Sequence, residues 1–152
     1  MTNTTRKYRN YGKVLEQRCA LEGDCLVWTG STTRLGYGQM SYRGKLESVH
    51  RVAWEVAHGP VPSGMEVDHT CWNRACCNVQ HLRLAEHRQN SRSLSGAHSR
   101  NKLGVRNVRM KGSSYEVSVG GVYIGRFATL EEASGVAEKE RANRYGDFSG
   151  RG

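Results

Sequence analysis

Apolar and polar residues alternate in short runs near the start of the chain and then change to a helical spacing. Alternation at Cys25–Gly30, Gly36–Tyr42 and Leu46–Val49 predicts strands of a small antiparallel sheet. From Ser48 onward the spacing is helical, and Gly59-Pro60 ends the predicted helix. The stripe that this helix would bury repeats every three or four residues: Val49, Val52, Ala53, Val56 and Ala57.

The next segment combines short predicted elements with chemically versatile residues. One predicted strand ends in Asp68-His69, and a second covers His81–Leu84 with alternate apolar positions. The loop between them contains three cysteines. Glu86–Ser93 then has the composition of a polar helix that presents Asn90. We therefore expect two strands, a cysteine-containing loop and a helix in one compact motif.

The composition changes after Asn90, and a second pattern follows. Residues 91–100 are rich in Ser and Arg, which is typical of a linker. Alternation then returns in three runs: Val105–Met110, Tyr115–Val119 and Val122–Phe127. Gly120-Gly121 is a strong hairpin signal, and Thr129-Leu130-Glu131-Glu132 fits the capping box of a helix. This part is therefore expected to be a three-stranded sheet followed by one helix.

Composition and charge indicate small modules with a polyanionic partner. The chain has 152 residues, of which 37% are hydrophobic, so its cores are thin and would need support from a metal or a partner. Its net charge of +9 favours nucleic acid, although a merely soluble basic protein is the alternative. The excess is uneven, because six basic and no acidic residues lie between Ser91 and Lys111. A surface oriented on phosphates would show such a face.

The cysteines and the N-terminus indicate a reducing compartment. Five cysteines cannot all pair within one chain, and residues 1–13 carry no apolar run that resembles a signal peptide. No apolar segment approaches the length of a membrane span. We therefore expect a cytoplasmic protein without membrane contact, in which clustered Cys and His bind metal more often than they form disulfides.

A structural zinc site is predicted from the cysteine-containing loop. Cys71, Cys76 and His81 are separated by four residues at each step, and thiolate and imidazole are the ligands that Zn²⁺ prefers. A closed tetrahedral site needs a fourth ligand. The candidates for it are Cys25, Cys77, Cys19 and His87, and Cys77 is disfavoured because adjacent side chains in extended structure point apart.

The same segment contains the groups that metal-assisted phosphodiester hydrolysis needs. His69 is the natural base near neutral pH. The Asp68 carboxylate and the Asn90 amide oxygen suit Mg²⁺, or Mn²⁺, which takes oxygen ligands and needs few protein groups. Without further context, a surface aspartate and a satisfied core histidine are the alternative. His69 would also face away from Asp68 in a regular strand.

These residues resemble the HNH, or ββα-metal, nucleases, and most closely the His-Cys box branch of the homing endonucleases. The matching residues are His69-Thr70-Cys71, Cys76, Asn78, His81-Leu82 and Asn90. The resemblance implies that His69 activates water and Asn90 binds Mg²⁺, and that Cys25 completes the zinc site. Asp68 matches the phage HNH branch, in which an aspartate shares the catalytic metal. Val79 replaces a frequent proline, and no cysteine follows Cys77, so the second zinc site of the His-Cys box is missing.

Residues 103–148 resemble a second family, the AP2 DNA-binding domain, which is appended to some homing endonucleases. Gly104-Val105-Arg106, Tyr115-Glu116-Val117, Ile124–Phe127 and Thr129–Ala133 carry this resemblance. It implies that the sheet lies in the major groove of DNA. The implied contacts are Arg106, Arg109, Lys111, Tyr115, Tyr123 and Arg126, of which Lys111 would meet phosphate. Tyr115 stands where an AP2 sheet usually has tryptophan.

The sequence therefore predicts an α+β protein: a small antiparallel sheet with a zinc-stapled ββα-metal nuclease motif, then an AP2-like three-stranded sheet and helix. The expected organisation is a basic arm at 1–18, an HNH nuclease domain with structural zinc at 19–95, a linker at 96–103 and an AP2-like domain at 104–152. The predicted function is a site-selective, homing-type endonuclease that cuts double-stranded DNA with one divalent metal, encoded by a phage and acting in the host cell.

Several points stay open at the level of sequence. A zinc-stabilised DNA-binding regulator without nuclease activity is the main alternative, and a disulfide-stabilised secreted protein is a weaker one. A monomer would tend to nick, whereas a homodimer could break both strands. The transition-state arginine is also open among three residues: Arg34, Arg43 and Arg51.

Overall fold

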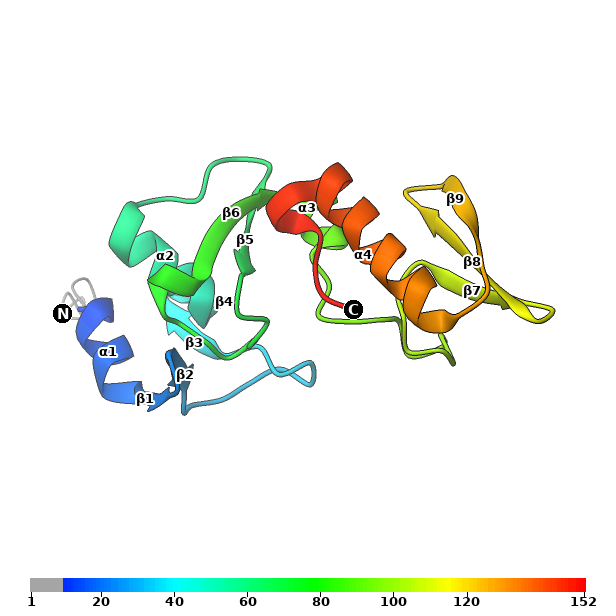
Figure 1. The fold of residues 1–152 in the computed structure, drawn as a ribbon. Helices are drawn as coiled ribbons and strands as arrows, with labels where there is room; N and C mark the ends of the chain where they lie inside the picture. The colour runs from blue at the N-terminus through cyan, green and yellow to red at the C-terminus, as the bar shows by residue number, and fades with distance from the viewer. Residues whose placement is uncertain (1–9) are drawn as a thin grey trace, which may run out of the picture. The chain divides into compact units, whose positions relative to one another are not determined.

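The computed structural model describes residues 10–152, and this chain divides into two compact units with the boundary between Glu86 and His87 (Figure 1). Both units combine helices with small antiparallel sheets, which confirms the predicted mixed class at this level. None of the described helices has the length and apolar character that crossing a membrane requires.

The described part of unit 1, residues 10–86, consists of short strands in three separate two-stranded sheets, together with two α-helices. In chain order the elements are α1 (Tyr11–Arg18), β1 (Cys19–Glu22), β2 (Cys25–Trp28), β3 (Gln39–Tyr42), β4 (Lys45–Ser48), α2 (Val49–His58), β5 (Met65–His69), the 3₁₀ helix η2 (Val79–His81) and β6 (Leu82–Glu86). The pairs are β1–β2, β3–β4 and β5–β6, all antiparallel.

The strand partners at the start of unit 1 differ from the expected single sheet. β2 pairs with β1 across the turn at Gly23, and β3 pairs only with β4. Alternation shows that a run is extended but not which run it pairs with, so β1 was missed. Part of the expected arm is a helix: α1 packs Tyr11, Val14 and Leu15 against the core. Residues 1–9 of that arm lie outside the described residues.

The core of unit 1 lies between α2 and the strands. Trp28, Val49 and Val52 are among its buried residues, and Trp28 is 4% exposed. Two glycines make room for this indole: a Cβ at Gly30 would lie 2.7 Å from the Trp28 ring, and one at Gly38 would lie 2.9 Å from it. Because real Cβ atoms do not approach so closely, alanine at either position would displace Trp28.

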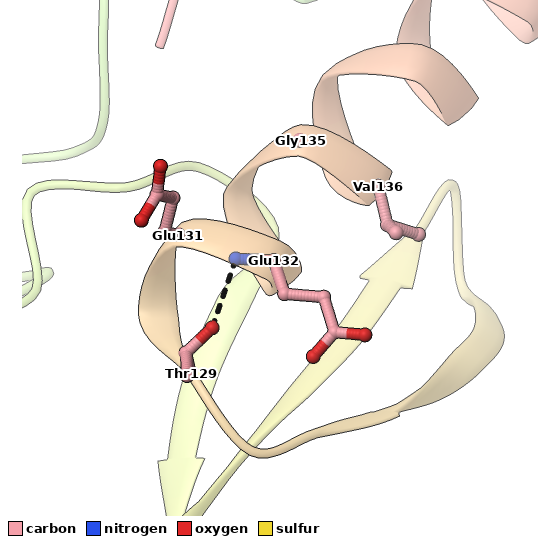
Figure 2. Close-up of a pocket in the computed structure, with 5 residues that line it drawn as sticks. All are labelled: Thr129, Glu131, Glu132, Gly135 and Val136. Carbon is pink, nitrogen blue, oxygen red and sulfur yellow. Dashed lines mark hydrogen bonds between the residues drawn. The ribbon is translucent and has the colours of Figure 1, made fainter.

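Unit 2 consists of a short helix, a three-stranded antiparallel sheet and a long helix. Its elements are α3 (His87–Arg92), β7 (Val108–Lys111), β8 (Ser114–Val119), β9 (Val122–Phe127), α4 (Leu130–Tyr145) and the 3₁₀ helix η3 (Gly146–Phe148). Helix α4 begins where the sequence predicted, since the Thr129 hydroxyl accepts a hydrogen bond of 3.2 Å from the Glu132 amide (Figure 2).

One face of the β7–β8–β9 sheet packs on α4 and forms a second core (Figure 1). Val117 and Val119 from the central strand meet Ala133 and Ala137 from the helix, and all four are fully buried. Small alanine side chains allow the helix axis to approach the sheet closely. The opposite face of the sheet, which carries Glu116, is not covered by this helix.

Candidate functional site

Four potential metal ligands converge in unit 1. The ligand atoms of Cys25, Cys71, Cys76 and His81 all lie within 4.8 Å of one another. The His81 Nδ1 atom lies 3.5 Å from the Cys25 sulfur and 3.6 Å from the Cys76 sulfur. In a tetrahedral zinc site with ordinary bond lengths, a sulfur and a nitrogen ligand are about 3.6 Å apart. The donor set and its spacing therefore both fit Zn²⁺.

The local structure explains how distant residues reach this cluster. Cys25 begins β2, whereas Cys71 and Cys76 lie in the loop after β5. Backbone hydrogen bonds from Trp28 to the Ala75 carbonyl and from Cys77 to the Leu26 carbonyl hold the loop against β2. Trp72 has a φ of 56°, a left-handed conformation that costs a bulky residue about 1 kcal/mol or more. The surrounding contacts impose that turn on the loop.

The cluster is energetically unsuited to holding charged thiolates without a cation. Burial is the main cause that raises the pKa of Cys76 to about 12. A bound Zn²⁺ would reverse this preference, because a metal-bound thiol is deprotonated. Spacing alone left the fourth ligand open, whereas the family resemblance implied Cys25. The converging atoms place Cys25, rather than Cys19, Cys77 or His87, with the other three ligands.

His69 is linked to this cluster through the backbone of Cys76. Its side chain is buried, with 6% of the residue exposed, and Nε2 lies 3.0 Å from the backbone carbonyl oxygen of Cys76. A carbonyl only accepts, so Nε2 carries the hydrogen and Nδ1 of the neutral ring keeps its lone pair. Burial lowers the pKa of His69 below its usual value, although the Cys76 carbonyl and Asp68 oppose this shift. The ring is thus neutral, oriented and basic at Nδ1.

Asp68 is ion-paired with an arginine that the sequence did not single out. On the neighbouring strand β6, Arg83 directly faces Asp68. Arg83 donates from Nε at 3.0 Å and from its terminal nitrogen at 2.9 Å, both to Oδ2 of Asp68. Asp68 is 8% exposed, so this partner stabilises a carboxylate that would otherwise be costly to bury. Only the strand register, which alternation does not encode, could have revealed the pair.

Aromatic and cationic neighbours surround His69. The ring of His50, from the second residue of α2, has its centroid 4.6 Å from that of His69. Tyr37 packs on both imidazoles, and the guanidinium of Arg74 lies over the Tyr37 ring. Burial and the nearby His69 lower the pKa of His50 to about 3, which keeps it neutral. The sequence patterns did not single out His50, because its contact with His69 depends on how α2 packs.

Asn90 lies in unit 2, on α3, whereas Asp68 and His69 lie in unit 1. Its side chain is half-buried. The predicted convergence of Asn90 with His69 on one phosphate stays a prediction.

The sheet of unit 2 carries a row of charged side chains on the face opposite α4. Arg109, Glu116 and Arg126 pair across the three strands. Glu116 is 3% exposed and accepts from Arg109 at 2.9 Å and from Arg126 at 2.6 Å, with Lys111 at 3.5 Å. Hydrogen bonds from Arg126 and Arg109 lower the pKa of Glu116 to about 2. One carboxylate therefore orders three exposed cations.

Two further predicted DNA contacts fall on different faces. Tyr123 is 55% exposed and pairs with Ser118, on the same face as Glu116. Tyr115 instead packs against the core under α4. A β-bulge between Val117 and Ser118 shifts the register of β9, which sequence alternation does not foresee.

Arg106 differs from the other predicted contacts, because its guanidinium is committed within unit 2. It is 9% exposed and donates to the backbone carbonyls of four residues: Arg92, Leu94, Ser149 and Arg151. Gly150 passes so close that a Cβ there would lie 2.3 Å from Arg106. This geometry supports a role in holding the C-terminal segment and the end of α3.

Arg106→Lys should therefore lower the stability of unit 2 without a matching change in the salt dependence of DNA binding. An ammonium cannot reach four carbonyls, and a lost hydrogen bond to a charged group costs about 1.5–3 kcal/mol. Thermal unfolding and amide hydrogen exchange at Leu94 and Arg151 would measure the effect. A variant with wild-type protection but a shallower salt slope would instead assign Arg106 to DNA.

The remaining cysteines and arginines have other partners. Cys19 and Cys77 contact each other, with their sulfurs 2.7 Å apart, and both are free thiols. Of the three arginines considered for the transition state, Arg51 pairs with Glu55 on its own helix and Arg43 lies over Tyr42. Neither of these partners, Glu55 and Tyr42, belongs to the proposed catalytic site.

Comparison with known proteins places the site in a family context. Residues 47–92 match the family model described as HNH endonuclease, a segment that includes Asp68, His69 and Asn90. No solved structure matches the chain significantly.

The related proteins come from phages. Protein 7.7 of Escherichia phage T7 is 42% identical over 71 residues, covering 47% of this chain and 55% of that protein. The uncharacterized gene 5.3 protein of Enterobacteria phage T3 is 61% identical over 33 residues, covering 22% of this chain and 33% of that protein. The chain thus spans about half or less of these two relatives.

Protein 2.8 of Escherichia phage T7 is similar over a longer stretch: it is 33% identical over 118 residues, covering 73% of this chain and 81% of that protein. Together with the HNH endonuclease match at residues 47–92, this extent of similarity shows that the chain is an HNH-type protein that belongs to the same family as Protein 2.8 of phage T7.

Proposed function

We propose that this protein is a site-selective, homing-type DNA endonuclease. His69 serves as the general base, and Asp68 and Asn90 hold one Mg²⁺ or Mn²⁺. A structural Zn²⁺ on Cys25, Cys71, Cys76 and His81 supports the site, and an AP2-like sheet in unit 2 binds double-stranded DNA.

The observation that carries this proposal is the hydrogen bond between His69 and the Cys76 carbonyl, at 3.0 Å. It selects the tautomer in which Nδ1 can accept a proton, and it orients the ring. The same residue, Cys76, places its sulfur in the metal-ligand cluster. Zinc would therefore fix the carbonyl that orients the base, so the structural and the catalytic parts share one residue.

The chemistry follows from these groups. His69 Nδ1 takes a proton from a water molecule, whose oxygen forms a bond to phosphorus while the bond to the leaving oxygen breaks. The divalent cation, when bound, supplies positive charge to the phosphate and the leaving oxygen. Burial keeps His69 neutral and ready to accept the proton. Asp68 is suited to a hard cation because carboxylate oxygen is a preferred ligand of Mg²⁺.

The charged face of unit 2 supports duplex binding. Arg109, Lys111 and Arg126 expose 71%, 61% and 51% of their side chains, yet all three are ordered by the buried carboxylate of Glu116. An arginine held in place loses less conformational entropy when it grips a base or a phosphate. A twisted three-stranded sheet of this kind can enter the major groove, which is wide enough for β-strands.

The activity is tested by incubating zinc-loaded protein with supercoiled plasmid and Mg²⁺. We expect nicked or linear products whose ends map to preferred positions, and no products without the divalent cation. A matched preparation of His69→Ala excludes a contaminating nuclease. Protein that binds DNA tightly but never cuts with Mg²⁺ or Mn²⁺ would favour the non-catalytic regulator instead.

The DNA-binding face is tested with a variant that removes two exposed cations together with the buried carboxylate that holds them. Arg109→Gln/Glu116→Gln/Arg126→Gln removes two cations together with their buried partner, and Glu116→Gln alone is the control. We expect weaker binding in the triple variant. The slope of log K against log salt should be shallower by about 0.9 for each of the two arginines that contacts a phosphate. Fluorescence anisotropy over a salt series measures both. Equal slopes in the triple variant and the control would place the DNA elsewhere.

A further inference from the structure

Arg83 is a cation placed directly on the carboxylate that is proposed to bind another cation. Two hydrogen bonds from Arg83 reach Oδ2 of Asp68, and among the described residues no hydrogen bond to Oδ1 of Asp68 is present. Oδ1 therefore retains its lone pairs for a metal ion. The guanidinium side chain is 20% exposed and the aspartate side chain 9%, so water screens this pair poorly.

We propose that Arg83 couples the binding of the divalent cation to the binding of DNA. This inference rests on the proposed function, because it takes Asp68 as a ligand of that cation. It assigns to Arg83 a positioning role that neither the HNH match nor the sequence indicated.

The coupling follows from the balance of charge at Asp68. In the DNA-free protein Arg83 already places a positive charge on the Asp68 carboxylate, so a divalent cation at Oδ1 would add further positive charge beside a guanidinium. Such like-charge repulsion is strong in a poorly screened site. A DNA phosphate brings the missing negative charge, which both Arg83 and the cation can share. Cation and DNA should therefore each bind better when the other is present.

Thermodynamic linkage makes the two effects equal. If DNA raises the affinity for the cation by some factor, the cation raises the affinity for DNA by the same factor. Without the guanidinium, the cation should bind the DNA-free protein more tightly and gain less from DNA. The loss of carboxylate orientation acts in the opposite direction, but fixing one short side chain matters less than a nearby charge.

The first measurement uses electron paramagnetic resonance to determine the affinity of zinc-loaded, DNA-free protein for Mn²⁺. We expect Arg83→Gln to bind Mn²⁺ about tenfold more tightly than the wild type, within the range of ordinary coupling between sites. Arg83→Lys keeps the charge and should bind Mn²⁺ as weakly as the wild type. Arg144→Gln is the matched control, because Arg144 pairs with Glu140 on α4 of unit 2, and neither residue is in the proposed site.

The second measurement is DNA affinity, by anisotropy of a labelled duplex, with and without Mg²⁺ in a His69→Ala background that prevents cleavage. Mg²⁺ also weakens DNA binding in general, because it competes with the protein for DNA phosphates. Asp68→Asn in the same background measures that competition. Relative to that reference, Mg²⁺ should raise DNA affinity when Arg83 is present and have little effect in Arg83→Gln. Arg83→Lys should retain the effect, which keeps the test valid if the glutamine variant folds poorly.

The outcomes separate this inference from the function on which it rests. If Asp68→Asn binds Mn²⁺ as well as the wild type, then Asp68 is not a ligand and the proposed catalytic site fails. If Asp68→Asn loses Mn²⁺ but Arg83→Gln binds it no more tightly than the wild type, the catalytic site stands and the coupling is refuted. Loss of coupling in Arg83→Lys would also refute it, because the charge is retained there.

Discussion

His69→Ala should abolish DNA cleavage while DNA affinity stays close to that of the wild type. The substitution removes the imidazole whose Nε2 donates to the Cys76 carbonyl and whose Nδ1 is the proposed proton acceptor. General base catalysis contributes about 10²–10⁴-fold to rate, so single-turnover cleavage should fall by at least that range. DNA affinity should persist because the imidazole is buried and contributes no cation. Plasmid cleavage and anisotropy on the same preparations measure the two quantities.

The control for this experiment is His58→Ala, a histidine at the exposed end of α2 that stacks on Trp54. It should leave the cleavage rate unchanged. Parallel losses of binding and cleavage in His69→Ala would contradict its role as a base and indicate a folding defect instead. Thermal unfolding of both variants distinguishes these cases.

The cleavage rate should also depend on pH in a defined direction. A general base works in its neutral form, so cleavage is lost as pH falls through the pKa of His69. Burial lowers that pKa below the usual 6.5, so cleavage should persist at pH 6.5 and decline only under more acidic conditions. Zinc content is measured in the same samples, because acid also protonates thiolate ligands. A midpoint above 6.5 would contradict a buried neutral base.

Loss of zinc should have the largest effect on stability. Cys71→Ser removes one ligand from the cluster that joins β2 to the loop after β5. Cys71 is only half-buried, so the loss of packing is small and the effect isolates the ligand role. Structural zinc supplies on the order of 10 kcal/mol to a small domain, which is comparable to the entire stability of an ordinary one. We therefore expect unit 1 to unfold.

The matched control is Cys19→Ser, which changes a half-buried cysteine that contacts Cys77 rather than the cluster. It should retain one zinc ion per chain by elemental analysis and most of its thermal stability. Chelation of the wild type should reproduce the defect of Cys71→Ser, with loss of hydrogen-exchange protection in β5 and β6. A folded Cys71→Ser protein without zinc would refute the structural metal.

Several elements could be predicted from the sequence because their signals are local. The stripe from Val49 to Ala57 specified α2, and its bounds, Val49–His58, agree with the prediction. The cap at Thr129 specified the start of α4. The sequence also grouped three metal ligands, Cys71, Cys76 and His81, because thiolate and imidazole groups at such short spacing are typical of a zinc site.

The contacts that decide the chemistry could not be predicted, because they depend on register and on packing between distant segments. Asp68 meets Arg83 only because β5 and β6 pair in one of several registers that alternation allows. His50 reaches His69 through the packing of α2, and Arg106 turns inward to carbonyls of its own unit. A buried arginine and an exposed one have the same local sequence signal.

The sequence by itself determined the residue types for hydrolysis and metal binding, the main helices and strands, and the basic character of the chain. These properties depend on composition and short-range periodicity. The tertiary structure alone decided that Cys76 orients His69 and that Arg83 occupies one oxygen of Asp68. It also brought Cys25, which only the family resemblance had implied, to the other three ligands. Those relations join atoms that are far apart along the chain, and only the folded backbone brings them within bonding distance.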